Sequence, residues 1–305
     1  MQNLTTLLDL SRDRIEQIFE TSARLKQGLR SGERPPLLAG RVVTQLFEKP
    51  SLRTRISFEA GVQQLGGGSV FLSGSDAGLN GREDTRDVAR VVGSYSDVIV
   101  LRTFAQSLID DFAACAGCVV VNGLSDASHP CQALTDLLTV QEAFGQIDGV
   151  TIAYVGDGNN VAASLAELCA VLDVPFRIAS PDGYTLPDGF LTGLTAQFPS
   201  ADIVQVTDPA EAVRGAQVVY TDVWASMGQE SEKEARARVF APYQVNAALM
   251  AEADKDAKFM HCLPARRGLE VTEEVMESPQ SIAFLQAENR MHLAKGLLVT
   301  LLGEN

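Results

Sequence analysis

Cysteine and aromatic residues are scarce in this sequence, and long basic or apolar tracts are missing. Five cysteines in 305 residues, an odd number spread widely, do not indicate a disulfide framework, so we expect a reducing, cytoplasmic compartment. A net charge of −14 without a Lys/Arg tract argues against a nucleic-acid partner. The N-terminal segment carries charges throughout, and the apolar segment 293–302 is too short to cross a bilayer. We therefore expect neither a signal peptide nor a membrane partner.

One Cys-x-x-Cys pair, Cys115 and Cys118, stands by itself in the chain. A structural zinc site needs two further ligands at matching spacing, and the sequence has no second pair of this kind. The pattern therefore favours ordinary packing, and no metal site is predicted from it.

Short apolar runs alternate with helical patterns along most of the chain. Runs of this kind, flanked by helices, are typical of a parallel sheet covered on both faces. The predicted strands are 42–47, 69–72, 97–101, 118–122, 150–155, 175–179, 203–206, 217–221 and 257–260. The predicted helices are 11–30, 53–65, 85–95, 106–115, 130–144, 160–172, 208–214 and 287–302.

This order of elements predicts an α/β protein of two doubly wound domains. Each is expected to hold a mainly parallel sheet flanked by helices, with the C-terminal helix returning to the first domain. We expect the first domain to span 1–132 plus 286–305 and the second to span 149–285, with 133–148 as a connecting helix.

Unusual polar residues recur where predicted strands end. Ligands of open α/β sheets bind beyond the carboxyl ends of the strands, so these residues are the candidate site. Six groups follow the strands in this way: Ser51–Arg55, Arg102–Thr103, His129–Gln132, Asn159–Asn160, Asp222–Met227 and His261–Pro264.

The first group places two cations at the start of a helix, where the dipole disfavours positive charge. An anion bound at the helix N-terminus would reverse that balance, with Ser51, Arg53 and Thr54 as donors. The alternative is a solvated turn in which Arg53 and Arg55 pair with surface acids. The Walker pattern of nucleotide-binding loops is absent.

Arg102 and His129 each allow two interpretations. Arg102 ends a buried strand, where its charge needs either a ligand or a structural carboxylate. His129 precedes Pro130 at a predicted helix start, close to Gln132, and either binds a small polar ligand or serves as a capping or core residue.

The stretch "GDGNNV" is similar to a dinucleotide-binding turn but lacks the third glycine. Asn159 and Asn160 either cap the next helix or bind a substrate carboxylate or carbonyl. Asp222 is suited to an ammonium group, with Ser226 and the Met227 backbone completing the contact; the alternative is a surface loop. Cys262 follows His261 directly, and adjacent residues of an extended segment point to opposite faces, which argues against Cys–His covalent catalysis.

Six stretches together resemble the aspartate/ornithine carbamoyltransferase family, in the family's order and over nearly the whole chain. They are "FEKPSLRTRISFEAGVQQLGG", "HPCQALTDLLT", "GDGNNVAASL", "DVWASMGQE", "HCLPARRGLEVTEEV" and "AENRMHLAKGLL". The resemblance implies transfer of a carbamoyl group from carbamoyl phosphate to the δ-amine of ornithine, giving citrulline and phosphate in arginine metabolism. It also implies a homotrimer and neither a metal nor an organic cofactor.

The same resemblance implies a role for each candidate residue. The first domain would bind carbamoyl phosphate and the second would bind ornithine. The residues implied for carbamoyl phosphate are Ser51, Leu52, Arg53, Thr54, Arg102, His129, Gln132, Cys262, Leu263 and Arg290. Those implied for ornithine are Asn160, Asp222, Ser226 and Met227, and those implied for catalysis are Arg102, His129, Cys262 and Asp222.

Leu52 departs from the family pattern, because many relatives have threonine there and relatives specific for N-acetylornithine also have leucine. N-acetylornithine or another amine is therefore an alternative substrate, although Asp222 favours a free α-ammonium group. Outside the family, the alternative is a nucleotide-binding, dehydrogenase-like protein built on "GDGNN".

Overall fold

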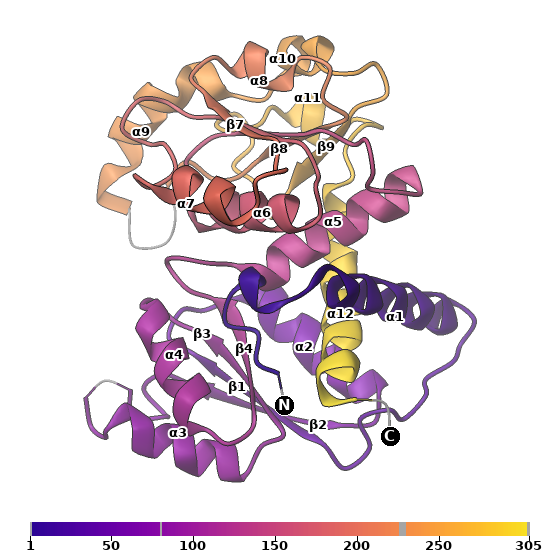
Figure 1. Cartoon of the computed structure of the whole chain (residues 1–305), viewed down its shortest axis with the longest axis vertical. Helices are drawn as coiled ribbons and strands as arrows, with labels where there is room; N and C mark the ends of the chain where they lie inside the picture. The colour runs from indigo at the N-terminus through magenta and orange to yellow at the C-terminus, as the bar shows by residue number, and fades with distance from the viewer. Residues whose placement is uncertain (1, 80, 226–229, 304–305) are drawn as a thin grey trace. The chain divides into compact units, whose positions relative to one another are not determined.

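The structure is a computed structural model that describes residues 2–79, 81–225 and 230–303. The chain divides into two compact units, one formed by Met1–Leu138 with Glu288–Asn305 and the other by Thr139–Ala287. We call them unit 1 and unit 2. Two helices, α5 (Pro130–Phe144) and α12 (Ala283–Leu302), contain the points where the chain passes between units (Figure 1).

Unit 1 is built on a four-stranded parallel sheet in the order β2-β1-β3-β4. Four residues of β3, from Val98 to Leu101, are fully buried, as expected of a strand covered on both faces. The strands are β1 (Val42–Phe47), β2 (Gly68–Ser73), β3 (Val98–Arg102) and β4 (Val119–Leu124). The helices are α1 (Arg12–Arg30), α2 (Leu52–Gln64), α3 (Thr85–Ser94) and α4 (Gln106–Cys115), with a 3-10 turn at Leu7–Asp9.

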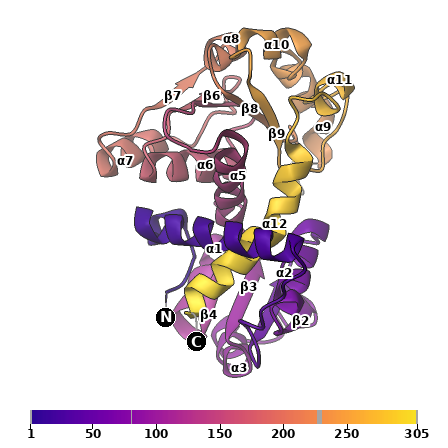
Figure 2. The same cartoon turned by 90° about the vertical axis from the view of Figure 1, so that its right-hand side faces the viewer.

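The C-terminal part of α12 packs on α1 within unit 1. The two helices cross in both cartoon views (Figure 2). Gly296 of α12 lies against Ile18 and Ser22 of α1, and the Arg14 side chain donates to the carbonyl of Thr300. The last helix of the chain is thereby fastened to the unit that holds the first strands.

Unit 2 is built on a five-stranded parallel sheet in the order β7-β6-β5-β8-β9. The strands are β5 (Ile152–Val155), β6 (Phe176–Ala179), β7 (Ile203–Val206), β8 (Val218–Thr221) and β9 (Lys258–His261). The helices are α6 (Asn160–Val171), α7 (Phe190–Gln197), α8 (Pro209–Val213), α9 (Lys233–Phe240), α10 (Ala247–Glu252) and α11 (Glu273–Met276), with 3-10 turns at Glu230–Glu232 and Ala241–Tyr243.

The strand order of each sheet creates one point where the winding direction reverses. In unit 1 the reversal lies between β1 and β3, and in unit 2 it lies between β5 and β8. Crossovers leave such a point in opposite directions, which opens a crevice beyond the carboxyl ends of the two strands. Each sheet therefore offers one preferred place for a ligand.

The predicted fold class is confirmed, and every predicted strand is present within two residues of its expected bounds. The final helix begins at Ala283 instead of residue 287, because its ladder already holds the bond from Gln286 N to Ile282 O. Four short helices, α7, α9, α10 and α11, were not predicted. They span eight residues or fewer, too few for a clear helical period, and α7 contains Gly193.

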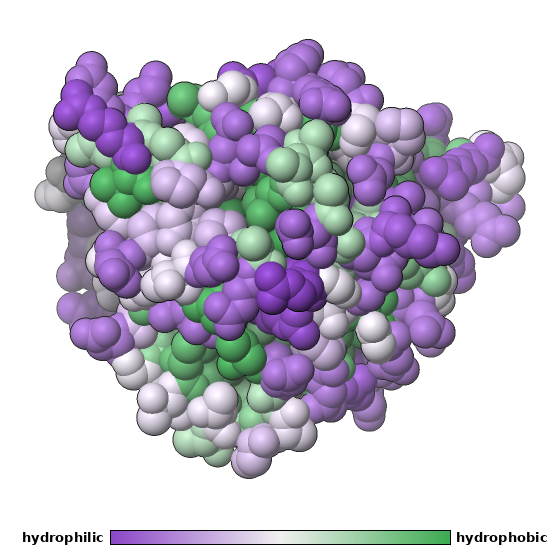
Figure 3. Space-filling view, turned by 90° about the horizontal axis from the view of Figure 1, so that it is seen from above, coloured by the Kyte–Doolittle hydropathy of each residue, from purple (hydrophilic) through white to green (hydrophobic). Residues whose placement is uncertain are grey.

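No helix among the described residues is long and apolar enough to cross a membrane. The face drawn in Figure 3 shows hydrophilic residues over much of its area, with hydrophobic residues between them in smaller patches.

Candidate active site

Ser51 directly precedes helix α2 and caps its first turn. Its extended backbone (φ −155°, ψ 117°) and its side chain, which accepts from Thr54 N at 3.2 Å, make it the N-cap. The first turn carries no acidic residue. Arg55 bonds Glu59 at 2.9 Å and lies over the Phe71 ring, so the surface-pairing interpretation holds for Arg55.

His129 lies among arginine side chains beyond the carboxyl ends of the strands of unit 1. We call this edge of a sheet, where the strands end, the rim of the unit. Burial, followed by the positive charge of Arg290, holds the pKa of His129 well below its ordinary value of 6.5. Arg102 and Arg53 act on that pKa in the same direction. The imidazole is therefore neutral near pH 7, while three guanidinium groups close to it create a strongly positive site suited to an anion.

Thr54 and Arg102 are both buried at this rim. Arg102 is the last residue of β3 and is 8% exposed, next to a register shift between β3 and β4. The Thr54 hydroxyl accepts from Arg290 Nη2 at 3.2 Å. Gly123 in β4 permits this packing, because a Cβ there would lie 2.9 Å from the Leu101 carbonyl and 3.6 Å from Thr54 Cγ2.

Gln132 and His129 lie together at the start of α5. Backbone N–H groups of Gln132 and Ala133 donate to the His129 carbonyl at 3.0 and 3.2 Å, which begins the helix. The Gln132 side chain is 3% exposed, and its Nε2 donates to Asp136 Oδ1 at 2.7 Å. The amide is thereby oriented by a carboxylate of the same helix.

Glu48 and Lys49 connect the three strand ends that carry these groups, and sequence analysis missed them. Glu48 N donates to the Arg102 carbonyl at 2.8 Å, and its Oε2 accepts from Phe104 N at 2.9 Å. Lys49 is 5% exposed and pairs with Asp126 in the loop after β4. The available signal was a cation two residues after a buried strand, which is similar to the signal that drew attention to Arg102.

In unit 2, Asn159 links the turn after β5 to the end of β8. Its Oδ1 accepts from the backbone of Val161 and Ala162 at 3.0 and 3.1 Å, so the capping interpretation is correct for this residue. Its Nδ2 donates to Asp222 Oδ2 at 3.1 Å. Asn160 is the first residue of α6. Both asparagines and Asp222 thus lie at the reversal point of the second sheet.

Gly158 has a structural reason to be glycine. A Cβ there would lie 2.3 Å from Leu186 N and from the Thr185 carbonyl carbon, and Gly158 N donates to the Tyr184 carbonyl at 2.8 Å. In a dinucleotide site the corresponding glycine lets a pyrophosphate approach the backbone. Here the chain segment 184–186 takes that place, which argues against the dehydrogenase-like alternative.

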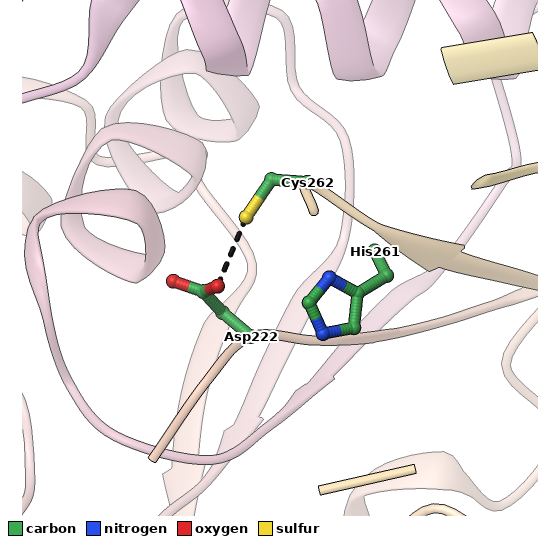
Figure 4. A group of neighbouring side chains, drawn as sticks. All are labelled: Asp222, His261 and Cys262. Carbon is green, nitrogen blue, oxygen red and sulfur yellow. Dashed lines mark hydrogen bonds between the residues drawn. The ribbon is translucent and has the colours of Figure 1, made fainter. Parts of the chain in front are cut away.

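Asp222 and Cys262 meet where β8 and β9 end (Figure 4). Asp222 is 7% exposed, and Cys262 Sγ points at its carboxylate and donates to Oδ1 at 3.0 Å. The thiol is thus oriented by a carboxylate, whereas Cys–His catalysis activates a thiol through an imidazole.

His261 lies beside this pair, and the ligand atoms of Asp222, His261 and Cys262 are within 4.8 Å of one another. Distance alone would allow a metal ion. However, His261 Nδ1 accepts from Leu263 N at 2.9 Å, and its Nε2 faces Glu270 Oε1 at 3.3 Å. Both ring nitrogens are therefore engaged, and this donor set fits a structural histidine better than a metal ligand.

The His261–Glu270 pair also supports the backbone of Leu263. Both side chains are fully buried, and Leu263 has a left-handed φ of 58° held by its bond to the imidazole. The Leu263 N–H is therefore engaged within unit 2. His261 belonged to one of the six candidate groups, but no binding or catalytic role was predicted for it, and Glu270 was not predicted at all.

Two predicted residues, Ser226 and Met227, lie outside the described residues. Just before them, Trp224 is 5% exposed and stacks on Phe240 with ring centroids 5.8 Å apart. The surface-loop interpretation is therefore wrong for Trp224.

Two family models match the chain. Residues 2–142 match "Aspartate/ornithine carbamoyltransferase, carbamoyl-P binding domain", and residues 148–301 match "Aspartate/ornithine carbamoyltransferase, Asp/Orn binding domain". Of the residues that make the positive site of unit 1, Ser51 to Thr54, Arg102 and His129 lie in the segment matched by the first model. Arg290 lies in the segment matched by the second model, together with Asn160, Asp222 and Cys262.

Curated relatives cover the same length. The chain is 47% identical to ornithine carbamoyltransferase of Bacillus subtilis, over 99% of this chain and 94% of the relative. It is 46% identical to that of Anoxybacillus flavithermus, over 99% and 96%.

Solved structures agree in fold. Ornithine carbamoyltransferase from Pyrococcus furiosus is 42% identical, with a TM-score of 0.92 over 98% of this chain and 96% of that one. An anabolic ornithine carbamoyltransferase from Campylobacter jejuni is 35% identical, with a TM-score of 0.91 over 99% of each chain.

Proposed function

The chain belongs to the aspartate/ornithine carbamoyltransferase family, and from that membership we propose that it transfers the carbamoyl group of carbamoyl phosphate to the δ-amine of L-ornithine. The products are L-citrulline and phosphate. In this proposal 1–132 plus 286–305 form the carbamoyl-phosphate-binding domain, 149–285 form the ornithine-binding domain, and 133–148 connect them.

Carbamoyl phosphate binds at the rim of unit 1, with its phosphate at the N-terminus of α2. Ser51, Arg53 and Thr54 hold the phosphate, since the positive end of the helix dipole lies at this first turn, which carries no acidic side chain. Arg102 bonds both the phosphate and the carbamoyl oxygen. Leu52 contributes its backbone, because its side chain is 69% exposed at the first helical position.

The carbamoyl group is polarised by neutral His129 together with Arg102, and Arg290 and Gln132 orient it. The lowered pKa of His129 supports this role, because a neutral imidazole donates one hydrogen bond without adding a fourth positive charge. Donors aimed at the carbonyl oxygen stabilise the negative charge that develops on it when the amine attacks.

Ornithine binds at the rim of unit 2. Asp222 pairs with its α-ammonium group, Asn160 bonds its α-carboxylate, and Ser226 and Met227, outside the described residues, complete the contact. Cys262 and Asp222 orient the neutral δ-amine, which attacks the carbamoyl carbon, and the Leu263 carbonyl contacts the carbamoyl amide. The tetrahedral intermediate then collapses and expels phosphate, so no side-chain nucleophile is needed.

The oligomer is a homotrimer in this proposal, and the setting is arginine biosynthesis in the cytoplasm. Leu52 and Ile56 lie one turn apart on α2 and are 69% and 53% exposed, which supports an apolar contact with a second copy. The scattered free cysteines support a reducing compartment. Light scattering of the purified protein tests the trimer, and a monomeric mass would contradict it.

The observation that carries the proposed function is 46–47% identity over 99% of the chain to ornithine carbamoyltransferases. The test is a citrulline-formation assay that offers ornithine, N-acetylornithine, putrescine and aspartate side by side with carbamoyl phosphate. We expect carbamoylation of ornithine at a kcat/KM at least about a hundredfold above the others. N-acetylornithine and putrescine lack the α-ammonium group that pairs with Asp222, and aspartate has no second amine to react while its α-ammonium group is bound.

A higher kcat/KM with N-acetylornithine than with ornithine would overturn the proposal for free ornithine. It would also point to Leu52 as a residue that determines which substrate is chosen. Leu52→Thr is the matched variant for that arm, since it restores the residue common in relatives. We expect Leu52→Thr to leave the preference for ornithine unchanged.

A further inference from the structure

Arg236, on α9, joins four separate segments of unit 2 although none of the proposed binding contacts includes it. It is 7% exposed. Its Nη1 donates to Asp157 Oδ2 at 2.7 Å and to the Trp224 carbonyl at 3.0 Å, and its Nε donates to Glu232 Oε2 at 2.8 Å. Its guanidinium also lies 4.8 Å from the centroid of the Tyr184 ring.

Two of these partners lie next to proposed ornithine ligands. Asp157 follows β5, in the same turn as Asn160, and Trp224 follows β8, in the same segment as Asp222. Asn159 already bonds Asp222 across this point at 3.1 Å. One Nη1 atom of Arg236 therefore bridges the two strand ends a second time, through Asp157 and the Trp224 carbonyl.

The charge of Arg236 also favours the ionised form of Asp157. The Asp157 side chain is 13% exposed, and burial raises its pKa while Arg236 opposes that rise. The charge of Asp222 raises the pKa of Asp157 further. Without the guanidinium, Asp157 would have to take up a proton or move toward water, because an unpaired buried charge is costly.

We propose that Arg236 is a positioning residue for the ornithine site: by holding Asp157 and the Trp224 carbonyl together, it sets the separation of Asn160 and Asp222. Arginine suits this task because its planar fork bonds several oxygens at once, which a lysine ammonium on its flexible stem does not reproduce. The inference rests on the proposed function only for the identity of the amine.

The experiment compares Arg236→Met, Arg236→Lys and the double variant Arg236→Met with Asp157→Asn. KM is measured separately for carbamoyl phosphate and for whichever amine the wild type carbamoylates, with thermal unfolding as the readout of stability. Arg238→Met is the matched control, because Arg238 lies exposed on the same helix and its replacement removes the same charge.

We expect Arg236→Met to raise KM for the amine at least about tenfold and to change KM for carbamoyl phosphate less than about twofold. Adding Asp157→Asn is expected to reverse at least about a third of the rise in log KM for the amine, because the unpaired carboxylate is removed. Arg238→Met is expected to match the wild type in both constants.

A parallel rise of both KM values, following the loss of thermal stability, would mean a merely structural role and overturn the proposal. The proposal would also be overturned if KM for the amine were as high in the double variant as in Arg236→Met. Removing the unpaired Asp157 charge would then have no effect, and Arg236 would act on the substrate and not through Asp157. If Arg236→Met is not recovered folded, Arg236→Lys decides: a selective rise in KM for the amine supports the proposal, and any other result refutes it. Failure of the wild type with ornithine would refute only the proposed function.

Discussion

Replacing Asp222 with asparagine separates the two proposed substrate sites. Asp222 is 7% exposed, accepts from Asn159 Nδ2 at 3.1 Å and accepts from Cys262 Sγ at 3.0 Å. Asparagine has nearly the same shape, so the packing should survive. It removes the negative charge and turns one acceptor into a donor, which then faces either Asn159 or Cys262.

The expected loss follows from these contacts. An ammonium group bound to a buried carboxylate contributes about 2–3 kcal/mol more than one bound to a neutral amide. At about 1.4 kcal/mol per factor of ten, KM for ornithine should rise roughly 30- to 150-fold. KM for carbamoyl phosphate should change less than about threefold, because its proposed ligands belong chiefly to unit 1.

The assay is citrulline formation with one substrate varied while the other is saturating. Asp188→Asn is the control, because Asp188 is exposed in the same unit and its replacement changes the net charge equally. Equal losses for both substrates would refute the assignment of Asp222 to ornithine. An unchanged KM for ornithine would refute it as well.

Three further predictions concern unit 1. Arg53→Ala is expected to abolish turnover through lost carbamoyl phosphate binding, and unchanged phosphate affinity in calorimetry would contradict that role. Because the folded chain holds the pKa of His129 low, protons bind preferentially to the unfolded chain below about pH 6.5, and stability falls there by up to about 1.4 kcal/mol per pH unit. Denaturant titrations should show that His129→Gln loses less free energy of unfolding than the wild type between about pH 7 and about pH 5.5. An equal loss in the two proteins would count against the lowered pKa of His129. Lys49→Met and Asp126→Asn should each raise KM for carbamoyl phosphate several-fold, because each breaks the same pair. The double variant Lys49→Met with Asp126→Asn should raise KM for carbamoyl phosphate little more than either single variant does. If the two increases in KM multiply fully, Lys49 and Asp126 do not act as a coupled pair.

Sequence alone was sufficient to locate the strands of this protein. Runs such as Val98–Leu101 are buried on both faces, so they are continuously apolar. Each such strand can therefore be identified from its own residues, without knowledge of the strand that it pairs with. Helices such as α9 were missed because they are short and polar, and their formation depends on contacts made elsewhere, as between Arg236 and Asp157.

Local chemistry also indicated which polar residues to examine, because a charge or amide directly after a buried strand needs a reason. It left two interpretations open at Asn159, Arg53 and His129. At Asn159 the structure favours the cap, through bonds to Val161 and Ala162. Around His129, guanidinium groups distant in sequence create the positive site, and their proximity is not written in any one segment.

Local burial patterns and residue type thus specify where the strands lie along the chain, where they end and which polar residues follow them. The fold was needed to show which strand ends are neighbours, that Asp222 contacts Cys262 and Asn159, and that Glu48, Lys49 and Arg236 connect the loops around them. Pairing across a sheet and ion pairs between loops depend on the order in which the crossovers place the strands, and no single stretch of residues specifies that order.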